Sequence, residues 1–574
     1  MAKRKAKKAK KTKRLFGLKP YQATTLAVLA LLDCLVIAMM GFVVVRATLN
    51  ANNAPAVAAT VPAEAENAAV SPTPAPPTAT PEPPPPTWTP QASPTPVGME
   101  SLYTFVPAEC SFEIPAGANV ECGFVGVPET RDDSPSTQIV QLAVAIYRSP
   151  DPVSDPVIFL TGGPGGDVVG DSDAMYEDFI APLLAERDFI AFDQRGTGLS
   201  KPNLECWEYA SVIEDDLDKN YSPEQRSEAY PRALRNCHNR LISEGTNPAA
   251  YTSAANAADV KDLARSLGYE RASLYGASYG TRLALTVMRD HPEVVSSVVL
   301  DAVEPVEILL YNRMAASADR LLNKIFEGCA ADPGCRAAYP NLEAKYYDLV
   351  ERLDTYPVEL WTRMPGEKMY RIQLSGTWLT RVIFSSSYTS EAIAFMPRVI
   401  HDTYNGDYTL MEWILTLGVS AETDISIGMS LSVNCHEEAF ATTPQQLAVD
   451  YAAYPHLENF ANAAVYGTPA TLFTICEEWG AAPFDPLEGE PVASDIPTLV
   501  LAGEYDPITP PEYARQVAEH LSNSFYYEFP GQGHGVGMWQ SPCAAEIMRT
   551  FLHDPSVAPD AGCIADMEGP DFFY

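Results

Sequence analysis

Three residues far apart in the chain have the types and settings that nucleophilic catalysis needs. Ser278 lies in Gly276-Ala277-Ser278-Tyr279-Gly280, a spacing typical of a sharp turn that exposes a serine hydroxyl. His534 lies in the glycine-rich segment 530–535, and Asp506 follows a long apolar run. A serine that attacks a carbonyl, a histidine that takes its proton and a carboxylate that orients the histidine together perform acyl transfer.

Each of these assignments has an ordinary alternative. The serine pentapeptide by itself also occurs in glycine-rich turns without catalytic function. Asp506 could simply cap the turn before Pro507, in which case Glu504, two residues earlier, would be the orienting acid. A histidine flanked by glycines is poorly suited to a packed core, which favours a functional role for His534.

Strands and helices of the right kind surround the three residues. The apolar and β-branched runs predict strands at 155–160, 272–275, 294–300, 496–502 and 524–529, and a helix at 279–291. Ser278, Asp506 and His534 each follow a strand, and their order in the chain is that of the α/β-hydrolases. We therefore predict an α/β-hydrolase fold, with a mostly parallel sheet flanked by helices.

A glycine-rich segment after the strand 155–160 is suited to stabilising an oxyanion. In Thr161-Gly162-Gly163-Pro164-Gly165-Gly166 the missing side chains allow backbone N–H groups to face a ligand. The expected donors are the N–H groups of Tyr279 and Gly163, with Gly162 in reserve. The alternative is a phosphate-binding loop, but neither glycine pattern typical of such loops is present.

These motifs taken together resemble the proline iminopeptidase and tripeptidyl aminopeptidase family over roughly residues 100 to 565. The resemblance rests on five segments: 161–166, 193–200, 276–281, 503–510 and 533–535. Residues 464–563 are similar to the C-terminal domain of secreted tripeptidyl aminopeptidases. Thr161 is a departure, because proline iminopeptidases carry histidine there, and this favours the tripeptidyl branch. The family implies a structural role for Asp193 and Arg195, in an internal ion pair or a turn cap.

The long interval between Ser278 and Asp506 predicts an inserted helical cap at 307–467, between core segments 99–306 and 468–574. If Cys435 pairs with Cys476, two pairs of glutamates come close together. These are Glu437, Glu438, Glu477 and Glu478. Because family aminopeptidases use cap carboxylates to bind a free α-ammonium, we expect one or two of them to bind the substrate amine. Adjacent glutamates that merely face solvent are the alternative.

Ten of the 11 cysteines follow the apolar N-terminal segment, and an even number outside the cytoplasm favours disulfides. Proximity in the chain suggests the pairs Cys110–Cys122, Cys206–Cys237, Cys329–Cys335, Cys435–Cys476 and Cys543–Cys563.

The N-terminal region predicts a membrane anchor. Residues 1–22 are strongly basic and would stay in the cytoplasm, 23–46 are apolar and long enough for a transmembrane helix, and 47–98 form a Pro/Thr/Ala-rich linker. The catalytic domain would then be extracytoplasmic. Cleavage near Arg46, which would release a secreted enzyme, is the alternative, whereas a lipoprotein site at Cys34 fits poorly.

The net charge of −35 argues against nucleic acid as a partner, because phosphate binding needs basic patches.

The predicted partners are the lipid bilayer and a peptide with a free amino terminus. The expected function is a serine aminopeptidase that releases short peptides or proline and needs no metal or organic cofactor. A carboxylesterase on the same scaffold and a non-catalytic surface binding protein are the alternatives.

Overall fold

The computed structural model describes residues 102–131, 138–219, 221, 223–363, 369–421 and 425–574. The basic segment 1–22, the transmembrane helix 23–46 and the linker 47–98 that the sequence predicts lie outside these residues. Within the described ranges, no helix is both long enough and apolar enough to cross a bilayer.

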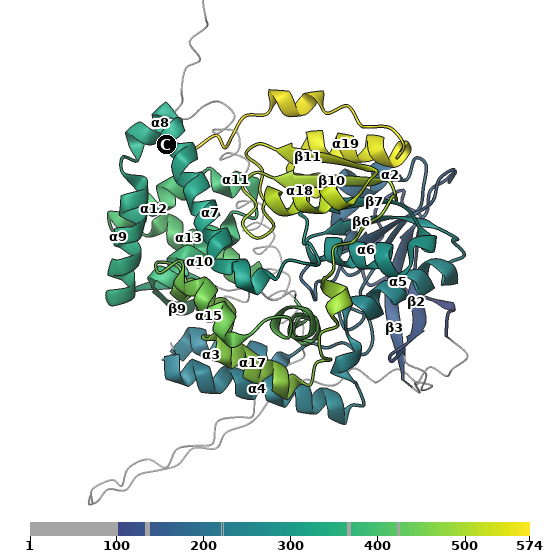
Figure 1. Ribbon diagram of the computed structural model, residues 1–574, viewed down its shortest axis with the longest axis horizontal. Helices are drawn as coiled ribbons and strands as arrows, with labels where there is room; N and C mark the ends of the chain where they lie inside the picture. Colours follow the sequence, from purple (N-terminus) through teal and green to yellow (C-terminus); the bar gives the residue numbers. More distant parts are fainter. Residues whose placement is uncertain (1–101, 132–137, 220, 222, 364–368, 422–424) are drawn as a thin grey trace, which may run out of the picture. The chain divides into compact units, whose positions relative to one another are not determined.

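A nine-stranded sheet forms the core, in the order β1-β2-β3-β5-β4-β6-β7-β10-β11 (Figure 1). From β5 to β11 all neighbouring strands are parallel, whereas β1, β2 and β3 extend the sheet through antiparallel pairs. The strands are β1 (Phe105–Ala108), β2 (Val120–Pro128), β3 (Ile139–Tyr147), β4 (Val157–Leu160), β5 (Phe189–Phe192), β6 (Ala272–Ala277), β7 (Val295–Asp301), β10 (Thr498–Gly503) and β11 (Ser524–Phe529). The predicted parallel sheet is therefore present.

Both faces of the sheet are buried, and side chains alternate between two hydrophobic clusters. On β4, Ile158 and Leu160 pack in one cluster, while Val157 and Phe159 pack in the other. Burial on both faces explains why the central strands are continuous apolar runs. The core helices are α2 (Ala181–Leu183), α5 (Ser253–Ser266), α6 (Tyr279–Asp290), α18 (Pro511–His520) and α19 (Pro542–His553).

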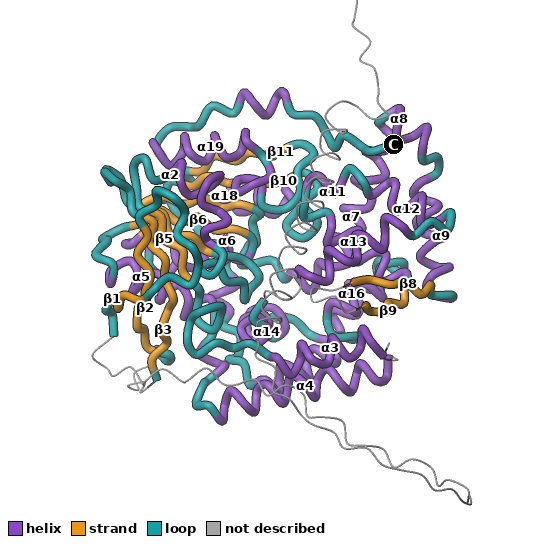
Figure 2. The backbone as a smooth tube through the Cα atoms, turned by 180° about the vertical axis from the view of Figure 1, so that it is seen from behind, coloured by secondary structure: helices purple, strands orange, loops and turns teal. Residues whose placement is uncertain are grey.

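Helices inserted between β7 and β10 form the cap, and several of them group together in Figure 2. They are α7 (Leu310–Ala331), α8 (Pro333–Ala338), α9 (Leu342–Thr355), α10 (Gly376–Ser386), α11 (Ser390–Ile393), α12 (Met396–Tyr404), α13 (Thr409–Ala421), α14 (Ile427–Asn434), the π-helix η6 (Cys435–Ala439), α15 (Pro444–Ala452), α16 (Glu458–Ala464) and α17 (Pro469–Trp479).

The inserted region differs from the sequence expectation in three respects. It contains a β-hairpin, β8 (Val358–Arg363) with β9 (Met369–Leu374). Its helices continue past residue 467, because α17 ends at Trp479. Two helices inserted earlier, α3 (Trp207–Lys219) and α4 (Pro223–Ser243), pack against β9 and α17 respectively. The boundaries were not visible in the sequence because amphipathic helices of core and cap have the same periodicity.

Five disulfides join the pairs that chain proximity suggests: Cys110–Cys122, Cys206–Cys237, Cys329–Cys335, Cys435–Cys476 and Cys543–Cys563. The pair Cys435–Cys476 joins η6 to α17 across 41 residues and so fixes two cap elements relative to each other.

Candidate active site

Ser278 occupies a sharp turn between β6 and α6. Its backbone lies at φ 57° and ψ −127°, a region that residues with a side chain rarely adopt. Glycines allow the close approach of strand and helix at this turn: a Cβ on Gly276 of β6 would lie 2.4 Å from the carbonyl oxygen of Gly280, and a Cβ on Gly280 would lie 1.9 Å from that of Leu160 on β4. The strained serine at the start of a helix is the geometry that the pentapeptide predicts.

Three hydrogen bonds link the serine turn to β7 and the segment after it. The N–H of Ser278 donates to the carbonyl of Asp301 at 3.0 Å. The hydroxyl of Thr281 donates to the carbonyl of Ser278 at 2.6 Å and accepts the N–H of Glu304 at 2.8 Å. The end of β7 and the segment after it therefore fix the position of the serine.

His534 and Asp506 are hydrogen-bonded, with 2.8 Å between Nδ1 and Oδ2. Asp506 is 1% exposed and also accepts the N–H groups of Ile508 and Thr509, at 3.0 and 2.8 Å, and the hydroxyl of Thr509 at 2.8 Å. These bonds use both oxygens of the Asp506 carboxyl group. A neutral imidazole then donates from Nδ1 to Asp506 and keeps Nε2 as an acceptor, which is what a general base requires.

Glu504, the alternative orienting acid, has other partners. Its carboxylate lies 3.0 Å from Nζ of Lys324 and accepts the N–H of Gly531 at 3.0 Å. The geometry therefore favours Asp506 as the partner of His534.

The pKa of His534 lies above its usual value. Burial disfavours the imidazolium, but the charge and hydrogen bond of Asp506, with smaller contributions from Asp301 and Glu304, outweigh burial. The surroundings thus stabilise the protonated histidine that forms when a serine proton is taken up.

Asp301, fully buried at the end of β7, connects the serine turn to the histidine loop. Its carboxylate accepts the N–H groups of Val536 and Gly537 at 2.9 and 2.8 Å, and the hydroxyl of Tyr275 at 2.7 Å. Asp301 directly follows the predicted strand 294–300, and the sequence assigned it no role. Its position at the end of a strand was the only local feature that could have indicated this role, because its hydrogen-bond partners are far away in the chain.

The glycine-rich loop lies against Ser278. A Cβ on Gly162 would be 2.8 Å from Cβ and 3.4 Å from Oγ of the serine. Tyr279 is the first residue of α6, where N–H groups have no acceptor within the helix. Gly163, the other expected donor, has a φ of 120° in the same loop. The loop and the helix start thus adjoin the serine as an oxyanion site requires.

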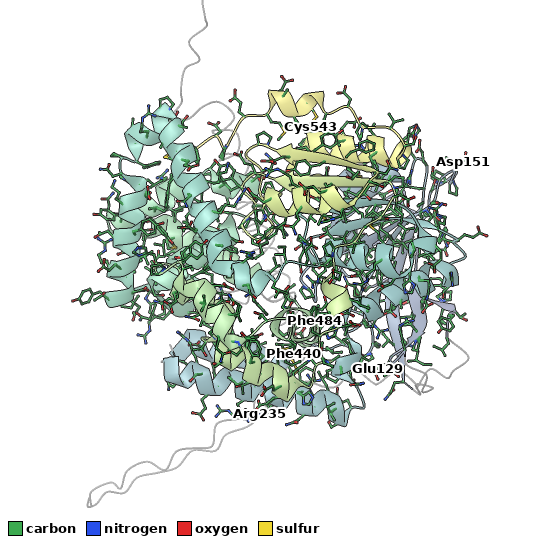
Figure 3. All side chains as sticks on the ribbon, in the orientation of Figure 1. Glu129, Asp151, Arg235, Phe440, Phe484 and Cys543 are labelled. Carbon is green, nitrogen blue, oxygen red and sulfur yellow. A yellow bond between two sulfur atoms is a disulfide. The ribbon has the colours of Figure 1, made fainter. Side chains whose placement is uncertain are left out.

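The four glutamates do not cluster as expected, although Cys435 and Cys476 are bonded. Glu437 and Glu438 are buried in η6, whereas Glu477 and Glu478 are exposed on α17. Cys476 faces inward on α17, so the two residues after it face outward. Glu478 pairs instead with Arg235 of α4, labelled in Figure 3, at 3.1 Å.

The two buried glutamates form a cluster around Arg282, four residues after Ser278. Glu437 lies 2.8 Å from Nε of Arg282, and Glu438 and Glu304 each lie 3.7 Å from its Nη1. Glu437 is fully engaged, because it also accepts the N–H and hydroxyl of Ser253 at 2.8 and 2.9 Å. Among the described residues, Oε1 of Glu438 is a buried oxygen without a hydrogen-bond partner.

Three buried carboxyl groups thus surround one buried guanidinium. Burial raises the pKa of Glu304 to about 7 and that of Glu438 to about 8, although Arg282 opposes both shifts. A positively charged ligand would favour the ionised forms of Glu304 and Glu438, because an opposite charge lowers the pKa of a carboxyl group.

The loop containing Asp193 and Arg195 is structural. Asp193 accepts the N–H groups of Val168, Val169 and Leu199 at 2.7 to 2.9 Å, and so caps turns. Arg195 is fully buried and pairs with Asp259 at 2.7 Å. The turn cap and the internal ion pair that the family resemblance implies are thus both present.

Comparisons with known proteins agree with this fold. Residues 155–364 match the family described as alpha/beta hydrolase fold, and residues 463–563 match the family described as TAP-like protein. The chain is a serine hydrolase of the α/β-hydrolase fold, and its segment 463–563 is similar to TAP-like proteins.

The chain is similar to serine proteases named Hip1. Those of Mycobacterium tuberculosis (strain ATCC 25618 / H37Rv) and Mycobacterium bovis (strain ATCC BAA-935 / AF2122/97) are each 21% identical over 462 residues, which covers 78% of this chain and 87% of theirs. Among solved structures, proline iminopeptidase of Mycobacterium smegmatis is 17% identical, with a TM-score of 0.35 over 76% of this chain and 100% of that one.

Proposed function

We propose that this serine hydrolase is an aminopeptidase that releases short peptides or proline from peptide amino termini. The observation that carries its chemistry is the hydrogen bond between His534 and Asp506. Both residues follow the carboxyl ends of parallel strands, as the strained Ser278 does. In the proposed mechanism, His534 removes the proton of Ser278 as Oγ attacks the scissile carbonyl, and it gives that proton to the leaving amine as the C–N bond breaks. The N–H groups of Tyr279 and Gly163 receive the oxyanion, with Gly162 in reserve, and water later hydrolyses the acyl enzyme.

The cluster around Arg282 supports a substrate with a free amino terminus. Glu304 follows β7 and interacts electrostatically with both His534 and Arg282, so the cluster adjoins the proposed catalytic base. Within the described part of the chain, Oε1 of Glu438 has no hydrogen-bond partner and lies 3.7 Å from Nη1 of Arg282, so it is the acceptor that an α-ammonium group would find there. Binding the amine at a set distance from Ser278 would restrict cleavage to the amino end of a peptide. The similarity to Hip1 agrees with peptide hydrolysis.

A carboxylesterase is the second candidate. Because burial raises the pKa of Glu304 to about 7 and that of Glu438 to about 8, both groups are partly protonated near pH 7, which would suit an uncharged substrate. An esterase would cleave simple esters and leave peptides with free amino termini intact.

The location we propose is the cell membrane, with the catalytic domain held outside by residues 23–46 and the linker 47–98. Its support is the basic and apolar N-terminal sequence. Secretion after cleavage near Arg46 is the alternative, and the N-terminal sequence of the mature protein distinguishes the two.

The decisive experiment compares the purified full chain with Ser278→Ala on tripeptidyl, prolyl, amino-blocked and simple ester chromogenic substrates. Wild type should cleave the free-amine peptides, and the variant should lose turnover and labelling by a serine-directed phosphonate. Persistent labelling of Ser278→Ala would refute the nucleophile, and hydrolysis of esters alone would establish the esterase.

A further inference from the structure

The cap contacts the loop that carries His534 through a compact set of hydrogen bonds. The cap segment 387–390 joins α10 to the start of α11, and the loop segment 532–540 follows β11. The N–H of His534 donates to the carbonyl of Tyr388 at 2.9 Å, and the N–H of Gly533 donates to the hydroxyl of Ser390 at 2.9 Å. The backbone of the proposed base is thus bonded to the cap.

Gln540 bridges the two segments with both ends of its amide. Its Oε1 accepts the N–H of Ser390 at 2.8 Å and also the hydroxyl of that serine. Its Nε2 donates to the carbonyl of Tyr388 at 3.0 Å and to the carbonyl of His534. Because a side-chain amide has two donor hydrogens and one acceptor oxygen, this arrangement uses its whole capacity.

The segments are also in close steric contact. A Cβ on Gly533 would lie 2.6 Å from the carbonyl oxygens of both Ser387 and Tyr388, so no side chain fits there. The rings of Tyr388 and His534 lie with their centroids 4.6 Å apart. The imidazole therefore packs directly on a cap residue.

The cap holds the glycine-rich loop in a similar way at a second point. The N–H of Ser426 donates to the carbonyl of Gly165 at 2.9 Å, and Ile425 forms a β-bridge with Gly166. One cap segment therefore contacts the loop of the proposed base, and a second cap segment contacts the loop of the proposed oxyanion site.

We propose that Ser390 and Gln540 are positioning residues that place His534 for proton transfer only while the cap segment 387–390 is seated on the histidine loop. This inference rests on the proposed serine hydrolase mechanism. Neither side chain touches the reacting atoms, and each acts through the backbone of His534 or its neighbours. A cap that selects the substrate would thereby also control the base.

The test measures kcat, KM, the rate of phosphonate labelling and Tm for the full chain carrying Ser390→Ala, Ser390→Thr or Gln540→Ala. Ser390→Ala and Gln540→Ala should lower kcat and the labelling rate in parallel by about 10- to 100-fold, with KM changed less than about threefold, because small displacements of catalytic groups are costly. Ser390→Thr keeps the hydroxyl and should restore most of the rate. The matched control is Gln516→Ala, which removes a 2.8 Å hydrogen bond to Glu307 that involves neither segment.

Wild-type rates in both alanine variants, or equal losses in Gln516→Ala, would overturn this inference while leaving the hydrolase mechanism intact. Should Gln540→Ala lower Tm strongly, Ser390→Ala decides. It removes only the hydrogen bonds of the serine hydroxyl and keeps the bond from the N–H of His534 to the carbonyl of Tyr388 and the bond from the N–H of Ser390 to Gln540. A wild-type protein that neither hydrolyses nor labels overturns the proposed function, and this inference with it.

Discussion

The N–H of Ser278 donates to the carbonyl of Asp301 at 3.0 Å, while the carboxylate of the same aspartate accepts two N–H groups of the histidine loop. One buried residue on β7 thus holds the strained serine on one side and the loop of His534 on the other. The separation between nucleophile and base depends on this shared support.

Asp301→Asn should therefore weaken both the fold and the activity. The amide NH2 would face N–H donors at Val536 or Gly537, which leaves buried groups unsatisfied and lowers the unfolding free energy by about 2 kcal/mol. Urea unfolding measures the change, with Asp290→Asn as the control because Asp290 is exposed and pairs with its neighbour Arg289. Equal unfolding free energies in the two variants would contradict the role of Asp301.

Asp506→Asn should lower kcat by about 10⁴-fold, as loss of the orienting carboxylate does in serine proteases. The asparagine would favour the wrong imidazole tautomer, although its size is unchanged. Steady-state kinetics of Glu504→Gln provides the comparison, and we expect a loss below about 10-fold because Glu504 pairs with Lys324. The opposite ranking of these two variants would make Glu504 the orienting acid.

The pH profile of kcat/KM should rise as His534 loses its proton, with a midpoint above the usual histidine value of about 6.5. Carboxylates near the imidazole stabilise its protonated form, so removing one of them lowers the pKa. Glu304→Gln should therefore move the acidic limb to lower pH. A midpoint in the variant that is equal to or above that of wild type would disagree with this electrostatic account.

Glu438→Gln should raise KM for peptides with free amino termini by about 10-fold or more, because a charged hydrogen bond to the ammonium is lost. KM for amino-blocked peptides and esters should change little. The matched control is Glu478→Gln, which removes a carboxylate that is exposed and paired with Arg235. Equal effects of Glu438→Gln on free and blocked substrates would exclude amine binding at this residue.

Local spacing was enough to predict the turn around Ser278 and five strands of the sheet, β4, β6, β7, β10 and β11, but not β1, β2, β3 and β5. Strand and turn signals depend on neighbouring residues, and β11 has the predicted bounds, whereas β10 begins two residues late, just after Pro497. Ser278, Asp506 and His534 each follow a predicted strand, so the sequence also indicated the strands after which they lie. The five disulfide pairs agree with simple proximity in the chain.

Long-range packing alone decided which polar groups meet. From the sequence we expected Glu437, Glu438, Glu477 and Glu478 to form one cluster. Instead, Glu477 and Glu478 lie on the exposed face of α17, whereas Glu437 and Glu438 are buried in η6 beside Arg282. The choice of Asp506 over Glu504 and the bonds of Asp301 and Gln540 likewise depend on contacts between distant segments. Periodicity indicates that a face is buried, but what covers it is set by tertiary structure.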